Sequence, residues 1–219
     1  MWQSKCATSL ALVLAVGCGD SENAGGSGSG GAGEGGNATP GACDPETLCL
    51  DIVEQAPITE GRFAIVWFRL EGSVAADPTV ALDLPFDPTS TYVEVNLGDI
   101  PLPPDIDKVC QRECEEAIDC PMCTGDFAAS VAYVMVVVDA DMNGSIEPAE
   151  VAEPDNVVGI ANTAVVWSTT TTTSVEAPYD ELFPNGTIAG VAAYRIDSNA
   201  FVLATEGKVY ELKIGPDVF

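Results

Sequence analysis

The sequence of 219 residues contains no histidine. Without histidine the chain cannot form a Ser-His-Asp triad or a histidine-based zinc-protease motif, and it lacks the commonest general base of enzymes. No glycine-rich phosphate-binding loop joins a strand to a helix either. Two carboxylates could hydrolyse a glycoside, but nothing singles out a pair among 34 Asp and Glu residues. We therefore predict that the protein is not an enzyme.

Basic residues are scarce. The chain has 8 Lys and Arg against 34 Asp and Glu, which gives a formal net charge of −26 at pH 7. A surface of this sign repels a phosphate backbone, so we predict no nucleic-acid partner. The acidic residues are scattered along the chain instead of forming blocks. This pattern fits a solvated surface as well as a surface adapted to salt or divalent cations.

Long apolar runs are also missing, because no segment approaches the ~20 residues that a transmembrane helix requires. The apolar stretch near the start, Cys6–Gly17, has only twelve residues and follows a short segment with one positive charge at Lys5. A short basic segment followed by an apolar stretch of this length is typical of a secretory signal peptide. We therefore expect an exported protein.

The apolar stretch ends in Leu14-Ala15-Val16-Gly17-Cys18. This ending resembles the lipobox of bacterial lipoproteins, although Leu14 lies one position earlier than the leucine of that family. The resemblance implies that residues 1–17 are removed and that Cys18 is acylated. The acyl chains would then anchor the protein in the cell envelope, at the outer membrane or cell surface. The alternative is an ordinary signal peptide cleaved nearby, with Cys18 free or removed.

Residues 19–42 are rich in glycine and carry no large apolar side chain. Such a segment cannot bury enough surface to offset the entropy lost on ordering, so we expect residues 18–42 to form a lipid-anchored, disordered tether. A coil of this length and composition spans about 25–30 Å. The remaining residues, 43–219, are enough for one globular domain.

Hydrophobic periodicity in the domain favours strands. Apolar and polar residues alternate over Tyr92–Leu97 and Lys208–Ile214, which gives each segment one apolar face. Arg62–Leu70 and Val131–Val138 are nearly continuous apolar runs, typical of central strands buried on both faces. Further strands are expected at Thr163–Ser168, Thr187–Ile196 and Phe201–Thr205, with a tight turn at Glu206-Gly207 before the last strand.

We therefore predict an all-β fold, an antiparallel β-sandwich of about seven or eight strands. The pattern indicates one helix of note, Lys108–Ile118, inside a small cysteine-rich insertion.

The domain contains six cysteines: Cys43, Cys49, Cys110, Cys114, Cys120 and Cys123. An even number in an exported domain predicts disulfides, which would leave no thiol for nucleophilic catalysis. Cys43 and Cys49 are near enough in sequence to close a local loop. Helical spacing would put Cys110 and Cys114 on one face, which favours the nested pairs Cys114–Cys120 and Cys110–Cys123. A four-cysteine zinc site is the competing interpretation.

Residues 139–150 read Asp139-Ala-Asp141-Met-Asn143-Gly144-Ser145-Ile146-Glu147-Pro-Ala-Glu150. Calcium prefers six to eight oxygen ligands at about 2.3–2.6 Å. The alternate residues Asp139, Asp141 and Asn143 can direct three oxygens at one centre. Gly144 permits the positive φ that a sharp turn around an ion requires.

This segment resembles the calcium loop of EF-hand proteins. The resemblance implies that Ser145 contributes its backbone carbonyl, that Glu147 binds directly or through water, and that Glu150 binds through both carboxylate oxygens. It also implies that Ile146 packs the loop onto the domain. The resemblance covers twelve residues only, because a strand precedes the loop and Pro154 limits the helix after it. The alternative is an acidic turn without an ion.

Together these features predict a calcium-binding lipoprotein of the cell envelope with a structural or surface role. A single loop without long helices has no groove to expose, so a signalling role is not expected. The alternative function is a calcium-stabilised module that binds carbohydrate or an envelope protein. Trp67 and Trp167 are candidate sugar platforms for that function, although each lies in an apolar run typical of a core.

Overall fold

The computed structural model describes residues 43–54, 61–71, 74–110, 127–177, 179–204 and 208–215. These residues form one continuous sheet with a short α-helix and three 3-10 helices. The strands are β1 (Thr47–Glu54), β2 (Arg62–Glu71), β3 (Val74–Pro85), β4 (Tyr92–Asn96), β5 (Val109–Cys110), β6 (Ala128–Val137), β7 (Val157–Ser168), β8 (Gly190–Asp197), β9 (Ala200–Leu203) and β10 (Val209–Ile214). The helices are α1 (Pro148–Val151), η1 (Leu97–Asp99), η2 (Asp105–Asp107) and η3 (Pro154–Asn156).

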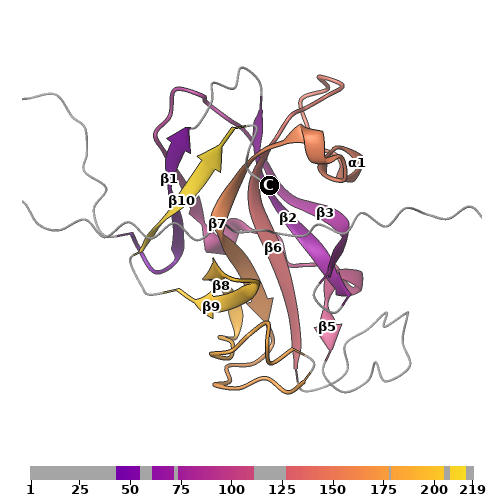
Figure 1. Cartoon of the computed structure of the whole chain (residues 1–219), viewed down its shortest axis with the longest axis vertical. Coiled ribbons are helices and arrows are strands. Elements are labelled where there is room, and N and C mark those ends of the chain that lie inside the picture. Colours follow the sequence, from indigo (N-terminus) through magenta and orange to yellow (C-terminus); the bar gives the residue numbers. More distant parts are fainter. Residues whose placement is uncertain are drawn as a thin grey trace, which may run out of the picture.

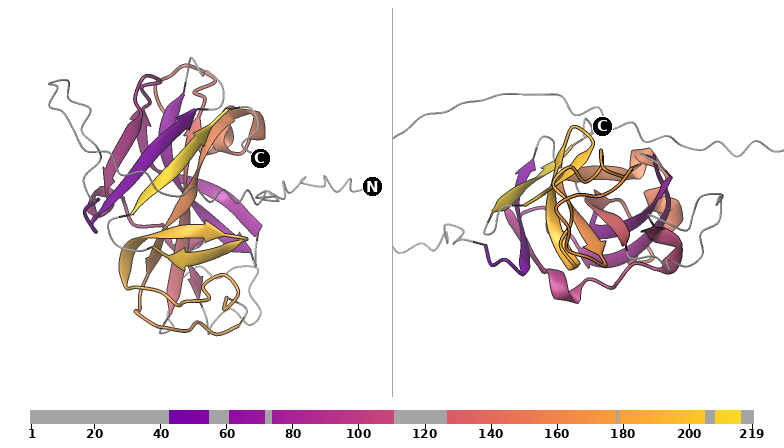
Figure 2. Two further views of the ribbon diagram at one scale, coloured as in Figure 1. Left: turned by 60° about the vertical axis from the view of Figure 1, so that its left-hand side comes forward. Right: turned by 90° about the horizontal axis from the view of Figure 1, so that it is seen from below.

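The sheet has the strand order β3-β2-β6-β7-β10-β1-β4 and curls into a half-barrel (Figures 1 and 2). It forks at β7, because β10 pairs with residues 159–161 and β8 pairs with residues 163–168 of the same edge. The hairpin of β8 and β9 extends the second branch, and the short β5 pairs with the start of β6. The β1–β10 pair is parallel, and the other described pairs are antiparallel.

The central strands β2, β6 and β7 are buried on both faces. On β2, Phe63, Ile65 and Trp67 pack into one apolar cluster with residues of β1, β4 and β10. The intervening Ala64 and Val66 pack into a second cluster, with residues of α1, β9 and the chain before β8. Successive side chains of a strand point to opposite faces, so a continuous apolar run supplies both clusters. The prediction of two central strands with both faces buried is confirmed.

The all-β prediction is confirmed, and the structure adds the number and the arrangement of the strands. The described residues contain ten strands instead of seven or eight, and they belong to one curled mixed sheet instead of two stacked antiparallel sheets. The parallel contact arises because the last strand, β10, inserts between β7 and β1. The predicted inward faces of Lys208–Ile214 and Tyr92–Leu97 are confirmed by the burial of Tyr210, Leu212 and Val95.

The start of the predicted helix Lys108–Ile118 requires correction. Val109 and Cys110 form β5, whose backbone pairs with Ala129 and Ala128 of β6. Both residues are buried, and the β-branched Val109 suits this sheet position better than a helix. The rest of the insertion, with Cys114, Cys120 and Cys123, lies outside the described residues. The same is true of residues 1–42, which include Cys18, and of the turn predicted at Glu206-Gly207.

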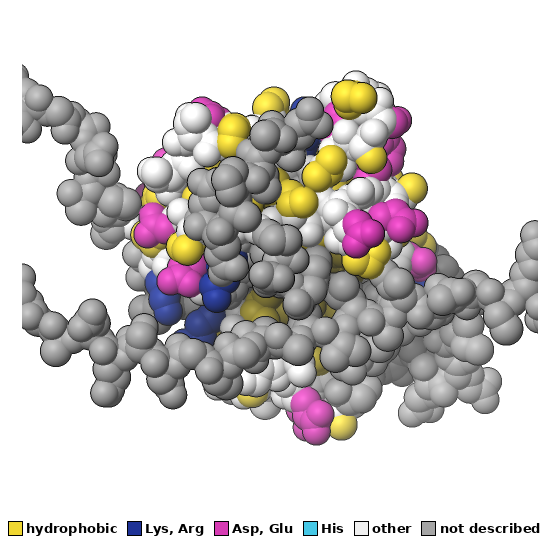
Figure 3. Space-filling view, turned by 45° about the horizontal axis from the view of Figure 1, so that its top comes forward, with side chains coloured by type: hydrophobic (Ala, Val, Ile, Leu, Met, Phe, Trp, Pro, Cys, Tyr) yellow, Lys and Arg dark blue, Asp and Glu magenta, His cyan; other side chains and the backbone are white. Residues whose placement is uncertain are grey.

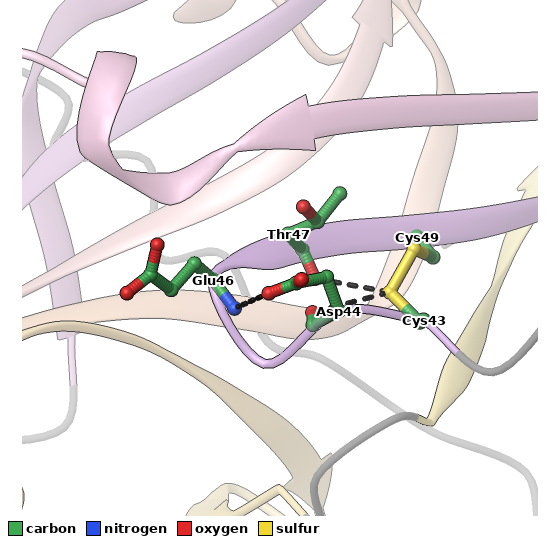
Figure 4. Close-up of a disulfide and its surroundings, with 5 residues drawn as sticks. All are labelled: Cys43, Asp44, Glu46, Thr47 and Cys49. Atoms are coloured by element: carbon green, nitrogen blue, oxygen red, sulfur yellow. Dashed lines mark hydrogen bonds between the residues drawn. A yellow bond between two sulfur atoms is a disulfide. The ribbon is translucent and has the colours of Figure 1, made fainter.

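Cys43 and Cys49 form a disulfide at the start of β1, with their Cα atoms 6.1 Å apart (Figure 4). A turn closed by the Thr47 N–H, which donates to the carbonyl oxygen of Asp44, brings the two cysteines together. The local pairing expected from their spacing is therefore confirmed. Cys110 is also disulfide-bonded.

Among the described residues, no helix has the length and apolar character needed to cross a membrane.

Candidate metal centre

The loop 139–150 follows β6, includes the first three residues of α1 and is fixed to the domain at several points. At its base, the Val138 N–H donates to the Asn156 carbonyl oxygen at 2.8 Å, which holds the strand leading in beside the chain leading out. The side chains of Ile146 and Val151 are buried in the apolar cluster that also contains Val137 and Val157. Ile146 therefore packs the loop onto the domain, as the EF-hand resemblance implies.

The carboxylate of Glu150 closes the loop. Its Oε1 accepts a hydrogen bond from the Ala140 N–H at 2.6 Å, and its Oε2 accepts one from the Glu147 N–H at 3.0 Å. The short helix α1 begins at Pro148, whose fixed φ suits a first helical turn, and this turn directs Glu150 back toward the start of the loop. One side chain thus joins the two ends of the twelve-residue segment.

Hydrogen bonding dominates the ionisation of Glu150. Burial by itself raises the pKa of this carboxyl, but hydrogen bonds from the backbone N–H groups of Glu147 and Ala140, together with smaller contributions from the Glu147 side chain and the Asp141 backbone, more than offset that effect. The net result is a pKa below the usual range, so Glu150 is an anion at neutral pH. A buried anion held by neutral donors is a suitable ligand for a cation.

Three carboxylates converge in the loop. One oxygen from each of Asp139, Asp141 and Glu150 lies within 4.8 Å of the other two. Two oxygens that each lie about 2.4 Å from one calcium ion are at most about 4.8 Å apart, so the three could share an ion with little movement. Asp139 is half-buried, Asp141 is exposed and Glu150 is buried.

Backbone donors hold the acidic side chains in this arrangement. The two carboxylate oxygens of Asp139 accept hydrogen bonds from the N–H groups of Asn143 and Gly144, at 3.1 and 2.7 Å. Asp141 Oδ1 accepts a further bond from the Asn143 N–H at 3.1 Å. Gly144 has a φ of 89°, as the sharp turn predicts, and Met142 also has a positive φ of 58°. The chain is thus folded around the point at which the carboxylates meet.

The side chain of Asn143 bridges two of the acids. Its Nδ2 donates to Asp141 Oδ2 at 3.0 Å and to Glu147 Oε1 at 2.6 Å. The partly positive amide group thus lies between two carboxylates and offsets part of their mutual repulsion. A rotation of the amide about its last torsion would present the oxygen instead, which is the atom that calcium requires.

The six predicted ligand residues are therefore close together in space, in two groups. Asp139, Asp141 and Glu150 form the converging carboxylate set. Asn143, Ser145 and Glu147 are linked to one another, since Ser145 Oγ lies 2.8 Å from Asn143 Oδ1 and 3.2 Å from Glu147 Oε1, and its one O–H can donate to either acceptor. Figure 3 shows several acidic side chains on the right of the molecule, the side on which Figure 1 places α1, and others elsewhere on the same face, including beside the main group of basic side chains.

One residue that contacts the loop was not expected from the sequence. Asp83 of β3 accepts a hydrogen bond from the Ile146 N–H through its Oδ2, at 3.0 Å. A single acid between Leu82 and Leu84 in an apolar segment is a weak signal for such a role. Asp83 and Ile146 are 63 residues apart in the sequence, so no local pattern indicates that they are in contact.

Comparisons of this chain with protein-family models, curated proteins and solved structures find no match.

Proposed function

We propose that this protein is a calcium-binding lipoprotein of the cell envelope, in which one Ca²⁺ at residues 139–150 stabilises the fold. The observation that supports calcium binding is the convergence of Asp139, Asp141 and Glu150 within 4.8 Å. Three like charges at this separation repel one another, and a divalent cation removes the repulsion. Asn143, Ser145 and Glu147 supply the remaining oxygens of the proposed ligand set.

The position of Glu150 distinguishes this loop from an ordinary acidic turn. A turn built from Asp and Asn requires only the short-range bonds that Asp139 and Asp141 make with Asn143 and Gly144. Glu150 lies beyond that turn, yet its carboxylate is brought back through α1 to within reach of the two aspartates. That return is the arrangement a multidentate oxygen site requires.

The surroundings of the loop support a structural role for the ion. Ile146 and Val151 belong to the main apolar cluster, so ordering the loop also orders part of the core. The helix after the loop has four residues, which is too short to swing away and expose a binding groove. Calcium would therefore act by joining the end of β6 to α1.

The tryptophans give the carbohydrate-binding alternative little support. Trp67 is buried, and its Nε1 donates to the Pro101 carbonyl oxygen at 2.9 Å. Trp167 is half-buried, and the Lys108 ammonium group lies 4.9 Å from the centre of its ring. Trp67 therefore offers no face to a sugar ring, and the lysine covers one face of Trp167. These contacts favour the structural role over carbohydrate binding.

Thermal unfolding in calcium and in chelator tests the calcium proposal. The wild type should melt at a higher temperature in calcium, since an ion at 100 times its dissociation constant adds about 2.7 kcal/mol. The double variant Asp139→Ala, Glu150→Gln should lose this difference. A matched control, Asp99→Ala with Glu94→Gln, changes the same charges at two exposed positions away from the loop and should keep it. Magnesium should stabilise the wild type less, because it demands a smaller octahedral shell.

Titration calorimetry, together with the melting temperatures, can contradict the calcium proposal. If the wild type melts at one temperature in both solutions and takes up no calcium at several millimolar, the loop is an acidic turn and the proposal fails.

The lipid anchor is tested separately. Two acyl chains on Cys18 should hold the wild type in the detergent-extractable membrane fraction. Cys18→Ser should move the protein to the soluble fraction of the envelope. An unchanged distribution of the variant would show that Cys18 does not carry the anchor.

A further inference from the structure

Asp83 joins the candidate calcium loop to the sheet. It lies in β3 opposite Ala64 of β2, where its side chain reaches two partners. Its Oδ1 lies 2.6 Å from Arg62 Nε in an ion pair, and its Oδ2 accepts the hydrogen bond from the Ile146 N–H at 3.0 Å. Both side chains of the ion pair are only 17% exposed, so the pair is held largely away from solvent.

The point of attachment lies within the proposed ligand set. Ile146 separates Ser145, whose carbonyl is a proposed ligand, from Glu147, whose carboxylate is another. The side chain of Ile146 is buried, and its N–H is bonded to Asp83, so both the direction and the depth of this backbone segment are fixed. The exposed side of the loop, by contrast, is held by bonds between its own residues.

The ion pair suits Asp83 for this position. Hydrogen bonds to a charged acceptor are stronger than bonds between neutral groups, so the carboxylate holds the Ile146 N–H firmly. Arg62 keeps the carboxylate oriented and offsets its negative charge. Asp83 can thus order the loop without adding to the repulsion among the three converging acids.

We propose that Asp83, oriented by Arg62, is a positioning residue for calcium binding by the loop. It presets the backbone between Ser145 and Glu147, so that less conformational entropy is lost when the ion binds. This inference rests on the proposed calcium function and adds to it a determinant of affinity on a different strand.

The experiment compares calcium affinity in three forms of the full chain by titration calorimetry. Asp83→Asn should raise the dissociation constant about tenfold, as loss of residues that orient metal ligands commonly does. A matched control, Asp105→Asn, breaks the ion pair between Asp105 of η2 and Lys108, which follows η2, and should leave the constant within about twofold of the wild type. Amide hydrogen exchange of Ile146 should be faster in Asp83→Asn than in the control.

A purely structural role predicts a different result. Asp83→Asn would then melt at a lower temperature in chelator and still bind calcium as tightly as the wild type, and this outcome would overturn the inference while leaving the proposed function intact. If the wild type itself takes up no calcium, the proposed function and the inference both fail.

A second variant covers the case in which Asp83→Asn does not fold. Arg62→Lys keeps the positive charge but loses the Nε–H that contacts Asp83, and it should weaken calcium binding about threefold. An unchanged dissociation constant in this variant would likewise overturn the inference.

Discussion

Two buried carboxyl groups lie near opposite ends of β6 and have opposite properties. Glu150 lies beyond the C-terminal end, at the candidate calcium loop, and is 9% exposed. Asp107 lies beside the N-terminal end, where Ser130 Oγ of β6 donates to its backbone carbonyl at 2.8 Å, and is 0% exposed. Burial alone would raise the pKa of both groups, because it disfavours the charged form.

The two carboxyl groups differ in the hydrogen bonds that they accept. Glu150 accepts bonds from the N–H groups of Ala140 and Glu147, and its pKa falls below the usual range. Among the described residues no backbone N–H donates to the side-chain oxygens of Asp107, and the nearby Thr79 side chain offsets only part of the effect of burial on its pKa. A buried anion is therefore stable in this fold where the backbone supplies donors, and the loop is built in that way.

The ionisation of Asp107 follows from its surroundings. Burial raises the pKa of Asp107 to about 6, against 3.8 for a free side chain. Thr79 lowers the pKa, the nearby negative charge of Asp77 raises it, and Arg69 lowers it. In the folded protein Asp107 is therefore neutral below pH 6 and is forced to carry a poorly stabilised charge above it.

The largest predicted effect comes from removing that charge with Asp107→Asn. The folded wild type binds more protons than the unfolded chain between about pH 4 and pH 6, so Asp107 makes its stability fall as the pH rises through this range. The loss amounts to about 3 kcal/mol for a shift of about two pKa units. Asparagine cannot ionise, so the variant avoids this loss. The free energy of unfolding of the variant, relative to that of the wild type, should therefore rise by about the same amount between pH 4 and pH 7. Urea unfolding at several pH values measures the difference.

The exposed neighbour provides the control for Asp107. Asp105→Asn, two residues earlier in η2, removes a carboxylate from an exposed position and should not reproduce the stability gained by Asp107→Asn at neutral pH. Equal slopes for wild type and Asp107→Asn would mean that Asp107 titrates normally, and the contrast with Glu150 would then be lost.

A smaller effect of opposite sign is predicted for Glu150→Gln. In chelator, where calcium plays no part, the variant loses a charged acceptor for two backbone N–H groups and places an amide N–H against one of them. The free energy of unfolding should fall by about 2 kcal/mol at neutral pH. Chemical denaturation in chelator measures this change, and a variant as stable as the wild type would show that the two hydrogen bonds do not stabilise the folded state.

The sequence predicts the parts of this molecule that depend on local patterns. Continuous apolar runs identify β2 and β6, and ligand spacing identifies the acidic loop, because each signal lies within about a dozen residues. The strand β3 was missed since Asp77 and Pro78 interrupt it. The structure accommodates them with a positive φ at Asp77 and with irregular pairing between β2 and β3.

The remaining features depend on contacts between distant segments. Alternation predicts the buried face of β10 but says nothing about its parallel pairing with β1, whose partners are more than 150 residues away. The hydrogen bond from the loop to Asp83 and the burial of Asp107 also depend on contacts between distant segments. Periodicity places a side chain on a face of a strand, and only the folded chain decides which other segment meets that face.

The smallest predicted effect separates the backbone of the loop from its carboxylates. Gly144 has a φ of 89°, and a Cβ added there would meet nothing within 4 Å, so Gly144→Ala should cost about 1 kcal/mol through backbone strain alone. Gly190, at the start of β8, has a φ of 91° and equally open surroundings, which makes Gly190→Ala the matched control. In chelator the two variants should be destabilised alike, as measured by chemical denaturation.

In calcium the same two variants should differ. The strain at residue 144 acts against the turn that brings Asp139 and Asn143 together, so Gly144→Ala should bind calcium a few-fold more weakly while Gly190→Ala binds as the wild type does. Equal calcium affinity in both variants would show that the carboxylates alone determine binding. The contribution of Glu150 would then depend on the N–H groups that donate to its carboxylate and not on the left-handed turn at Gly144.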